Sequence, residues 1–116
     1  MKKVLYAEDE YSNRKLMELL LEKRGVRCDL AEDGATAYNM FKRNRYSLVL
    51  LDQYLPGLLG SEVARKIRDE GSSVPLIAIT SDDSQIPLLR QSGFDLIFLK
   101  PLRGPDYMNA IMGYLE

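Results

Sequence analysis

The chain has 116 residues, which suits one domain and leaves no room for a second. Hydrophobic residues make up 46% of it and charged residues 28%, and 16 basic residues nearly balance 17 acidic ones, so the composition is that of a globular domain without the basic excess of a nucleic-acid-binding surface. Histidine is absent, which excludes catalysis by a Ser-His or Cys-His pair of this chain and any histidine metal ligand.

The single cysteine, Cys28, cannot form an internal disulfide, which favours a reducing compartment. The first residues lead straight into a short apolar segment followed by acids, unlike a secretory signal peptide. No apolar run approaches the ~20 residues that a membrane-spanning helix needs. We therefore expect a cytoplasmic protein that makes no membrane contact and binds no nucleic acid directly.

Strand-like and helix-like segments alternate along the whole chain. A strand at residues 4–7 precedes a helix at 11–24, and a strand at 26–31 precedes a helix at 34–44. A strand at 47–51 precedes a helix at 60–69, and a strand at 74–80 precedes a short helix that ends at residue 92. The last pair is a strand at 96–99 and a helix at 106–115. Five alternations predict a parallel sheet with helices on both faces, in a doubly wound topology.

Two helices carry more detailed signals. In the first, Leu16, Leu19 and Leu20 have helical spacing and are predicted to face the core, with Ser12 or Asn13 as the N-cap. In the fourth, Pro87 fits only the first helical turn, so regular helix should begin near residues 84–86 and the helix should be short.

Polar residues stand where four of the predicted strands end. Glu8 and Asp9 follow the first strand, Asp52 the third, Thr80 closes the fourth, and Lys100 follows the fifth. The strands of a parallel sheet all point the same way, so these groups should meet at one edge, where ligands bind in open α/β sheets. Taken singly, each is better explained by a turn, a helix cap or a solvated charge than by a function. Only their gathering at one edge favours a functional site.

Three carboxylates brought together repel one another, unless one is protonated or a divalent cation lies among them. Asp9 and Asp52, Glu8 through water, and a backbone carbonyl would suit octahedral Mg²⁺. Lys100 and the hydroxyl of Thr80 are suited to phosphoryl oxygens. A carboxylate in such surroundings can attack a phosphoryl donor, and the product would be an acyl phosphate on Asp52.

Taken together, these motifs resemble the receiver domain of two-component response regulators, over essentially all of residues 1–116. Any one motif is weak, but the ordered set at this spacing is specific. The resembling segments are the acidic pair Glu8-Asp9, the second-strand block 25–34, the phosphoacceptor block 48–52 with Pro56-Gly57 and Gly60, and the pairs Thr80-Ser81 and Lys100-Pro101.

The resemblance implies a flavodoxin-like (βα)5 sandwich whose five parallel strands have the order 2-1-3-4-5. It also implies that Asp52 accepts a phosphoryl group from a sensor histidine kinase or a histidine phosphotransfer protein. Asp9, Asp52 and the backbone carbonyl of Tyr54 would bind Mg²⁺ (or Mn²⁺) directly, and Glu8 mostly through water.

By the same resemblance, Lys100 would pair with Asp52 and then with the phosphoryl group. Thr80 would move toward the phosphate and carry the signal to a downstream protein target. Such domains usually hydrolyse their own acyl phosphate, so the site would be both acceptor and slow phosphatase.

The chain departs from the family pattern in three places. Ile97 stands where the family often has an aromatic residue, and Phe98 should not replace it because successive strand side chains face opposite ways. The segment from Thr80 to Gly93, which includes the fourth helix, is shorter than the usual family spacing by about half a helical turn. Tyr54 and Asp82 occupy variable positions beside the site, where Tyr54 could screen an acyl phosphate from water and Asp82 could repel an anion or orient a water, or both could be ordinary loop residues.

These departures leave open a second function, a receiver-like protein-interaction module that works without phosphorylation. The complete set of site residues opposes it. Other chemistries fit less well, because Glu8-Asp9-Glu10 would repel a flavin phosphate, and a haloacid-dehalogenase-type phosphatase would need an aspartate where Tyr54 stands.

Overall fold

The computed structural model describes residues 2–116 and contains a five-stranded parallel sheet. The strand order is β2-β1-β3-β4-β5, as the sequence predicted. The strands are β1 (Lys3–Ala7), β2 (Arg27–Ala31), β3 (Leu48–Asp52), β4 (Leu76–Thr80) and β5 (Leu96–Leu99). The α-helices are α1 (Tyr11–Glu22), α2 (Gly34–Arg43), α3 (Gly60–Asp69), α4 (Ile86–Gln91) and α5 (Asp106–Leu115), and a 3₁₀ turn, η1 (Asp83–Gln85), precedes α4.

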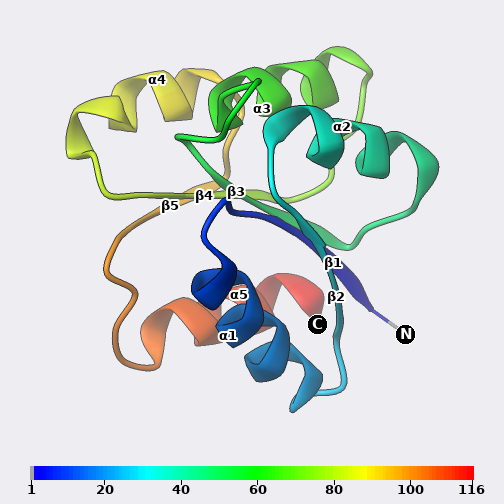
Figure 1. Cartoon of the computed structure of the whole chain (residues 1–116). Helices are drawn as coiled ribbons and strands as arrows, with labels where there is room; N and C mark the ends of the chain where they lie inside the picture. Colours follow the sequence, from blue (N-terminus) through cyan, green and yellow to red (C-terminus); the bar gives the residue numbers. More distant parts are fainter. Residues whose placement is uncertain (1) are drawn as a thin grey trace.

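The sheet lies between two helical layers. Helices α1 and α5 cover one face, and α2, α3 and α4 cover the other (Figure 1). Because side chains alternate along a strand, each central strand contributes to both layers: Leu50 of β3 belongs to the α1/α5 core and Leu51 to the α2–α4 core. This two-sided burial explains why the central strands are apolar without interruption.

The buried face of α1 differs from the prediction. Leu16 and Leu19 are 56% and 54% exposed, whereas Met17 and Leu21 are buried. The inward stripe also includes Arg14, whose guanidinium is buried because it finds hydrogen-bond acceptors there. Of the three leucines predicted to face the core, Leu20 is partly buried against it, whereas the prediction was wrong for Leu16 and Leu19, which lie on the outside of the helix. The predicted caps were wrong too, because Glu10 takes the N-cap position and makes no side-chain cap.

The fourth helix is short, as Pro87 indicated. Regular helix begins at Ile86, the 3₁₀ turn η1 precedes it, and α4 has only six residues. Ile97 and Phe98 of β5 face opposite layers, Ile97 toward the α2–α4 core and Phe98 toward the α1/α5 core. Phe98 therefore does not occupy the side of the sheet on which α4 lies.

No helix among residues 2–116 is both long enough and apolar enough to cross a membrane.

Candidate functional site

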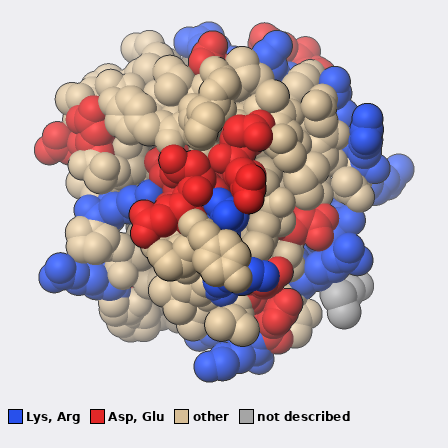
Figure 2. Space-filling model, viewed as in Figure 1, with Lys and Arg blue, Asp and Glu red and all other residues tan. Residues whose placement is uncertain are grey.

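The predicted polar residues meet at the carboxyl edge of the sheet. Asp52 is the last residue of β3 and Thr80 the last of β4, while Glu8 directly follows β1 and Lys100 directly follows β5. Both β1 and β4 pair with β3, so these side chains lie around the middle of the sheet. Figure 2 shows acidic side chains gathered there, between the two helical layers, with a basic side chain among them.

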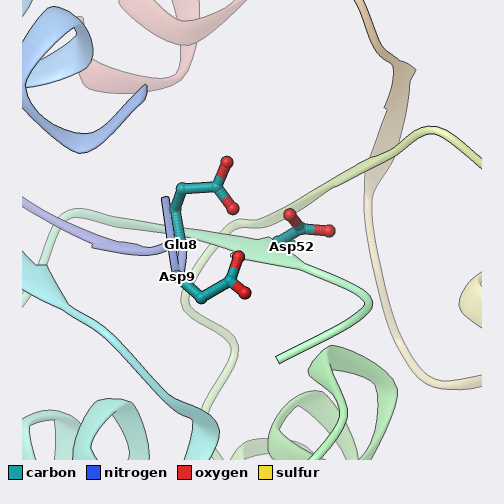
Figure 3. Close-up of side chains that lie close together, drawn as sticks. All are labelled: Glu8, Asp9 and Asp52. Atoms are coloured by element: carbon teal, nitrogen blue, oxygen red, sulfur yellow. The ribbon is translucent and has the colours of Figure 1, made fainter. Parts of the chain in front are cut away.

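Three carboxylates form the centre of the site. Glu8, Asp9 and Asp52 each offer an oxygen, and these oxygens lie within 4.8 Å of one another. Glu8 and Asp9 come from the end of β1 and Asp52 from the end of β3, and their carboxylates border one common space (Figure 3). Glu8 and Asp52 are buried, whereas Asp9 is exposed. Such a cluster could hold a metal ion and leave one side of it open.

Lys100 connects two of these acids. Its Nζ lies 2.6 Å from Asp52 Oδ2 and 2.9 Å from Glu8 Oε1. Burial alone would lower the pKa of Lys100, but the hydrogen bonds and charges of Asp52 and Glu8 outweigh burial and raise that pKa. The lysine is therefore held protonated between the two carboxylates. Its positive charge lies where it can neutralise a negative group bound at Asp52.

Glu8 is the most buried of the three acids, with only 1% of its surface exposed. Its Oε1 accepts hydrogen bonds from Lys100 and from Asn13 Nδ2, the latter at 2.6 Å. Its Oε2 has no hydrogen-bond partner among residues 2–116. Burial, followed by the neighbouring Asp52 carboxylate, raises the pKa of Glu8.

The oxygen of Glu8 that has no partner indicates whether a metal ion fits this site. A buried carboxylate oxygen without a partner is costly, and a cation or its bound water would satisfy it. The donors are all oxygens, which hard divalent cations such as Mg²⁺ prefer. The residues present therefore fit a metal of this class.

Thr80 and Tyr54 frame the mouth of the site. Thr80 is buried, and its hydroxyl accepts a hydrogen bond from the peptide N–H of Asp82 at 3.2 Å. The peptide N–H of Tyr54 donates to Asp52 Oδ1 at 3.3 Å, while its phenol donates to Asp82 Oδ2 at 2.6 Å. This bond raises the pKa of Tyr54, and the pKa of Asp82 is lowered by Ser84 and then by Tyr54. The side chain of Tyr54 thus bridges two loops beside Asp52.

Three residues that support the site were not predicted from the sequence. Asn13 and Arg14, in the first turn of α1, hold the side chain and the backbone of Glu8; Arg14 Nη1 donates to the carbonyl of Glu8 at 2.8 Å. Gln53 is completely buried directly after Asp52. Only Arg14 had a signal in the sequence. It has helical spacing with Met17 and Leu21, and a charged residue on such an apolar stripe indicates a buried side chain with polar partners.

Comparison with known proteins agrees with this geometry. The family model of the response regulator receiver domain matches residues 4–112. The chain belongs to this family. The receiver domain is 41% identical over 118 residues to the sensory transduction protein RegX3 of Mycolicibacterium smegmatis, covering all of this chain and 51% of RegX3. It is 31% identical to the polar-differentiation response regulator DivK of Brucella anthropi, covering 98% of this chain and 96% of DivK.

Solved structures share the fold of the receiver domain. The response regulator TrrA of Thermotoga maritima, crystallised with Mg²⁺-BeF, matches with a TM-score of 0.90 and 29% identity, covering 98% of this chain and 99% of TrrA. The chain spans about half the length of RegX3 and nearly all of DivK. The fold and the family predicted from the sequence are confirmed, and the interaction module that works without phosphorylation is not favoured.

Proposed function

We propose that residues 1–116 act as one phosphoacceptor unit, in which Asp52 takes a phosphoryl group from a phosphohistidine. The observation that carries the proposal is the position of Lys100, 2.6 Å from Asp52 and 2.9 Å from Glu8, beside a buried Glu8 oxygen without a partner. A purely structural ion pair would not require a third carboxylate, Asp9, within 4.8 Å of the other two.

In the proposed reaction an Asp52 oxygen attacks phosphorus, an O–P bond forms, and the P–N bond to the donor imidazole breaks. The electron pair of that bond stays on the imidazole, which then takes up a proton. Lys100 exchanges its contact with the free carboxylate for one with a phosphoryl oxygen. The Thr80 hydroxyl, which already lies at the end of the neighbouring strand, donates to another.

The proposed metal is Mg²⁺, with Mn²⁺ as the alternative. Asp9, Asp52 and the carbonyl of Tyr54 would hold it directly and Glu8 through water. When bound, it neutralises charge on the phosphoryl oxygens in the transition state. The crystallisation of TrrA with Mg²⁺-BeF supports this assignment.

The histidine donor has a suitable docking surface beside the site. A groove of about 430 Å³ lies next to α1, and its lining includes Lys100 and Ser81 at the site and Leu16 and Leu20 from α1. The exposed Leu16 and Leu19 continue this apolar surface outward. The occupant we propose is a helix of a sensor kinase or phosphotransfer protein, because the groove offers leucine side chains along α1 and ends at Lys100, which contacts Asp52. The compartment we propose is the cytoplasm, as expected from the lone Cys28.

Phosphorylation of the purified protein tests the proposal. Acetyl phosphate with Mg²⁺ should add a phosphate mass that is lost in mild base, as expected for an acyl phosphate. Asp52→Asn should abolish the increment, whereas Asp69→Asn, at the exposed end of α3, should keep it. Failure of the parent protein to take up phosphate, or uptake by Asp52→Asn equal to that of the parent, would refute it.

A further inference from the structure

Gln53 is a buried polar residue that the proposed chemistry does not use. It follows Asp52 directly and is 0% exposed. Its Oε1 accepts a hydrogen bond from the peptide N–H of Ser61 at 2.8 Å. Its Nε2 donates to Ser61 Oγ and to Gln85 Oε1, each at 3.1 Å. Every polar atom of this amide therefore has a partner, and one of the partners is 32 residues away in the chain.

The distant partner belongs to the start of the fourth helix. Gln85 is the last residue of η1 and the N-cap of α4. Its peptide N–H donates to the carbonyl of Asp82 at 3.2 Å, and the peptide N–H of Asp82 donates to Thr80 Oγ1 at 3.2 Å. One series of hydrogen bonds thus runs from Thr80 through Asp82 and Gln85 back to Gln53, beside the acceptor.

The next residue in the chain reinforces this connection. Tyr54 donates its hydroxyl to Asp82, so two consecutive residues after Asp52 hold the segment between β4 and α4. The Tyr54 side chain is 47% exposed, whereas the Gln53 amide is sealed from water. The Gln53–Gln85 bond is part-buried, but its donor belongs to a fully buried side chain, so the amide N–H that points to Gln85 has less access to water than the exposed Tyr54 hydroxyl has.

We infer that the Gln53–Gln85 hydrogen bond couples the state of Asp52 to the position of η1 and α4. This inference rests on the proposed phosphorylation of Asp52. When the Thr80 side chain moves to donate its hydroxyl to a phosphoryl oxygen, Oγ1 also shifts relative to the N–H of Asp82, so the segment around Asp82 must follow Oγ1 or give up that hydrogen bond. The hydrogen bond from Gln53 ties Gln85 to the end of β3. Because Gln85 is the N-cap of α4, a change at the end of β3 and in the Asp82 segment reaches the first turn of α4. The apolar side chain of Ile97 can make no such bond.

Amide hydrogen exchange of residues 83–91 tests this inference. It is measured in the parent and three variants, with and without Mg²⁺ and beryllium fluoride as the phosphoryl mimic. Gln85→Ala removes the acceptor, and Gln85→Glu keeps an acceptor oxygen. Gln91→Ala is the matched control, since it removes an exposed glutamine from the other end of α4. Gln53 is left in place, because its loss would also strip the N–H of Ser61.

In the parent, we expect the phosphoryl mimic to change exchange in residues 83–91. Gln85→Ala should exchange there roughly fivefold faster without the mimic, the factor for one net hydrogen bond, and should lose most of the response to it. Gln85→Glu and Gln91→Ala should respond like the parent. A full response in Gln85→Ala overturns the inference, and so does a Gln91→Ala response as weak as that of Gln85→Ala.

Phosphate uptake from acetyl phosphate and Mg²⁺, measured by mass in separate samples of the same four proteins without beryllium fluoride, separates this inference from the proposed function. A parent that takes up a base-labile phosphate but shows no change in residues 83–91 overturns the coupling and leaves the acceptor function intact. A parent that takes up no phosphate overturns both. Gln85→Ala should take up as much phosphate as the parent, which shows that its altered exchange response does not come from a damaged acceptor.

Discussion

Gly60 begins α3 directly against the backbone at the end of β3, and replacing it with alanine tests how Asp52 is placed. An added Cβ would lie 2.2 Å from the carbonyl oxygen of Asp52 and 3.1 Å from the Cα of Gln53. The first distance is more than 1 Å shorter than an ordinary contact, and the neighbouring atoms are backbone that no rotamer change can move aside. Overpacking of a core costs about 1–3 kcal/mol. We place Gly60→Ala at about 3 kcal/mol or more, a large share of the roughly 5–15 kcal/mol by which a domain of this kind is stable.

Urea unfolding followed by circular dichroism measures this cost, and Gly113→Ala is the matched control. A Cβ at Gly113, inside α5, would have nothing within 4 Å. The control should therefore gain about 0.5–1 kcal/mol from the lower backbone entropy of alanine in the unfolded chain. In Gly60→Ala, the affinity for Mg²⁺ should fall together with stability, because the clash displaces Asp52 itself. A stability within about 0.5 kcal/mol of the parent, with unchanged Mg²⁺ affinity, would refute the reasoning.

Three further predictions concern the site and α1. Lys100→Ala leaves the buried acids without their shared cation and should lower the free energy of unfolding by about 3–5 kcal/mol; Mg²⁺ should raise the melting temperature more than in the parent, and equal shifts would contradict this. Met17→Ala should cost about 2–5 kcal/mol in urea unfolding and Leu16→Ala less than about 0.5 kcal/mol, so equal losses would contradict the observed face of α1. Asp82→Asn removes the charged acceptor that favours the neutral phenol of Tyr54, so ultraviolet titration against Tyr54→Phe should show its pKa falling toward 10.0; a pKa that stays raised would assign the shift elsewhere.

The sheet and the meeting of polar residues at its edge followed from the sequence for a simple reason. Parallel strands share one direction, so residues that end different strands must gather at one edge wherever the strand order makes neighbours of them. Glu8, Asp52 and Lys100 are spread over 92 residues of sequence yet lie in hydrogen-bond contact through that rule. The catalytic and metal-binding roles assigned to these residues stay predictions until phosphorylation and Mg²⁺ binding are measured.

The face of α1 did not follow, because hydrophobic spacing assumes that every apolar residue seeks the core. In α1 the buried stripe accepts Arg14, which gains the carbonyl of Glu8 and the carboxylate of Glu32, and two leucines remain outside. Gln53 was missed for a related reason. An amide after a strand usually indicates a solvated loop, and its burial depends on Gln85, a partner that no local pattern identifies.

The sheet also separates two apolar cores that share no side chains. The proposed donor groove lies on the side of α1 and α5, whereas α4, which would respond to the acceptor, packs on the side of α2 and α3. Substitutions in the two cores should therefore act nearly additively on stability, for example at Leu89 and Ile111. This separation has a consequence for how such domains diverge. Residues on the face that a target recognises can change while residues on the opposite face, which selects the donor, stay the same.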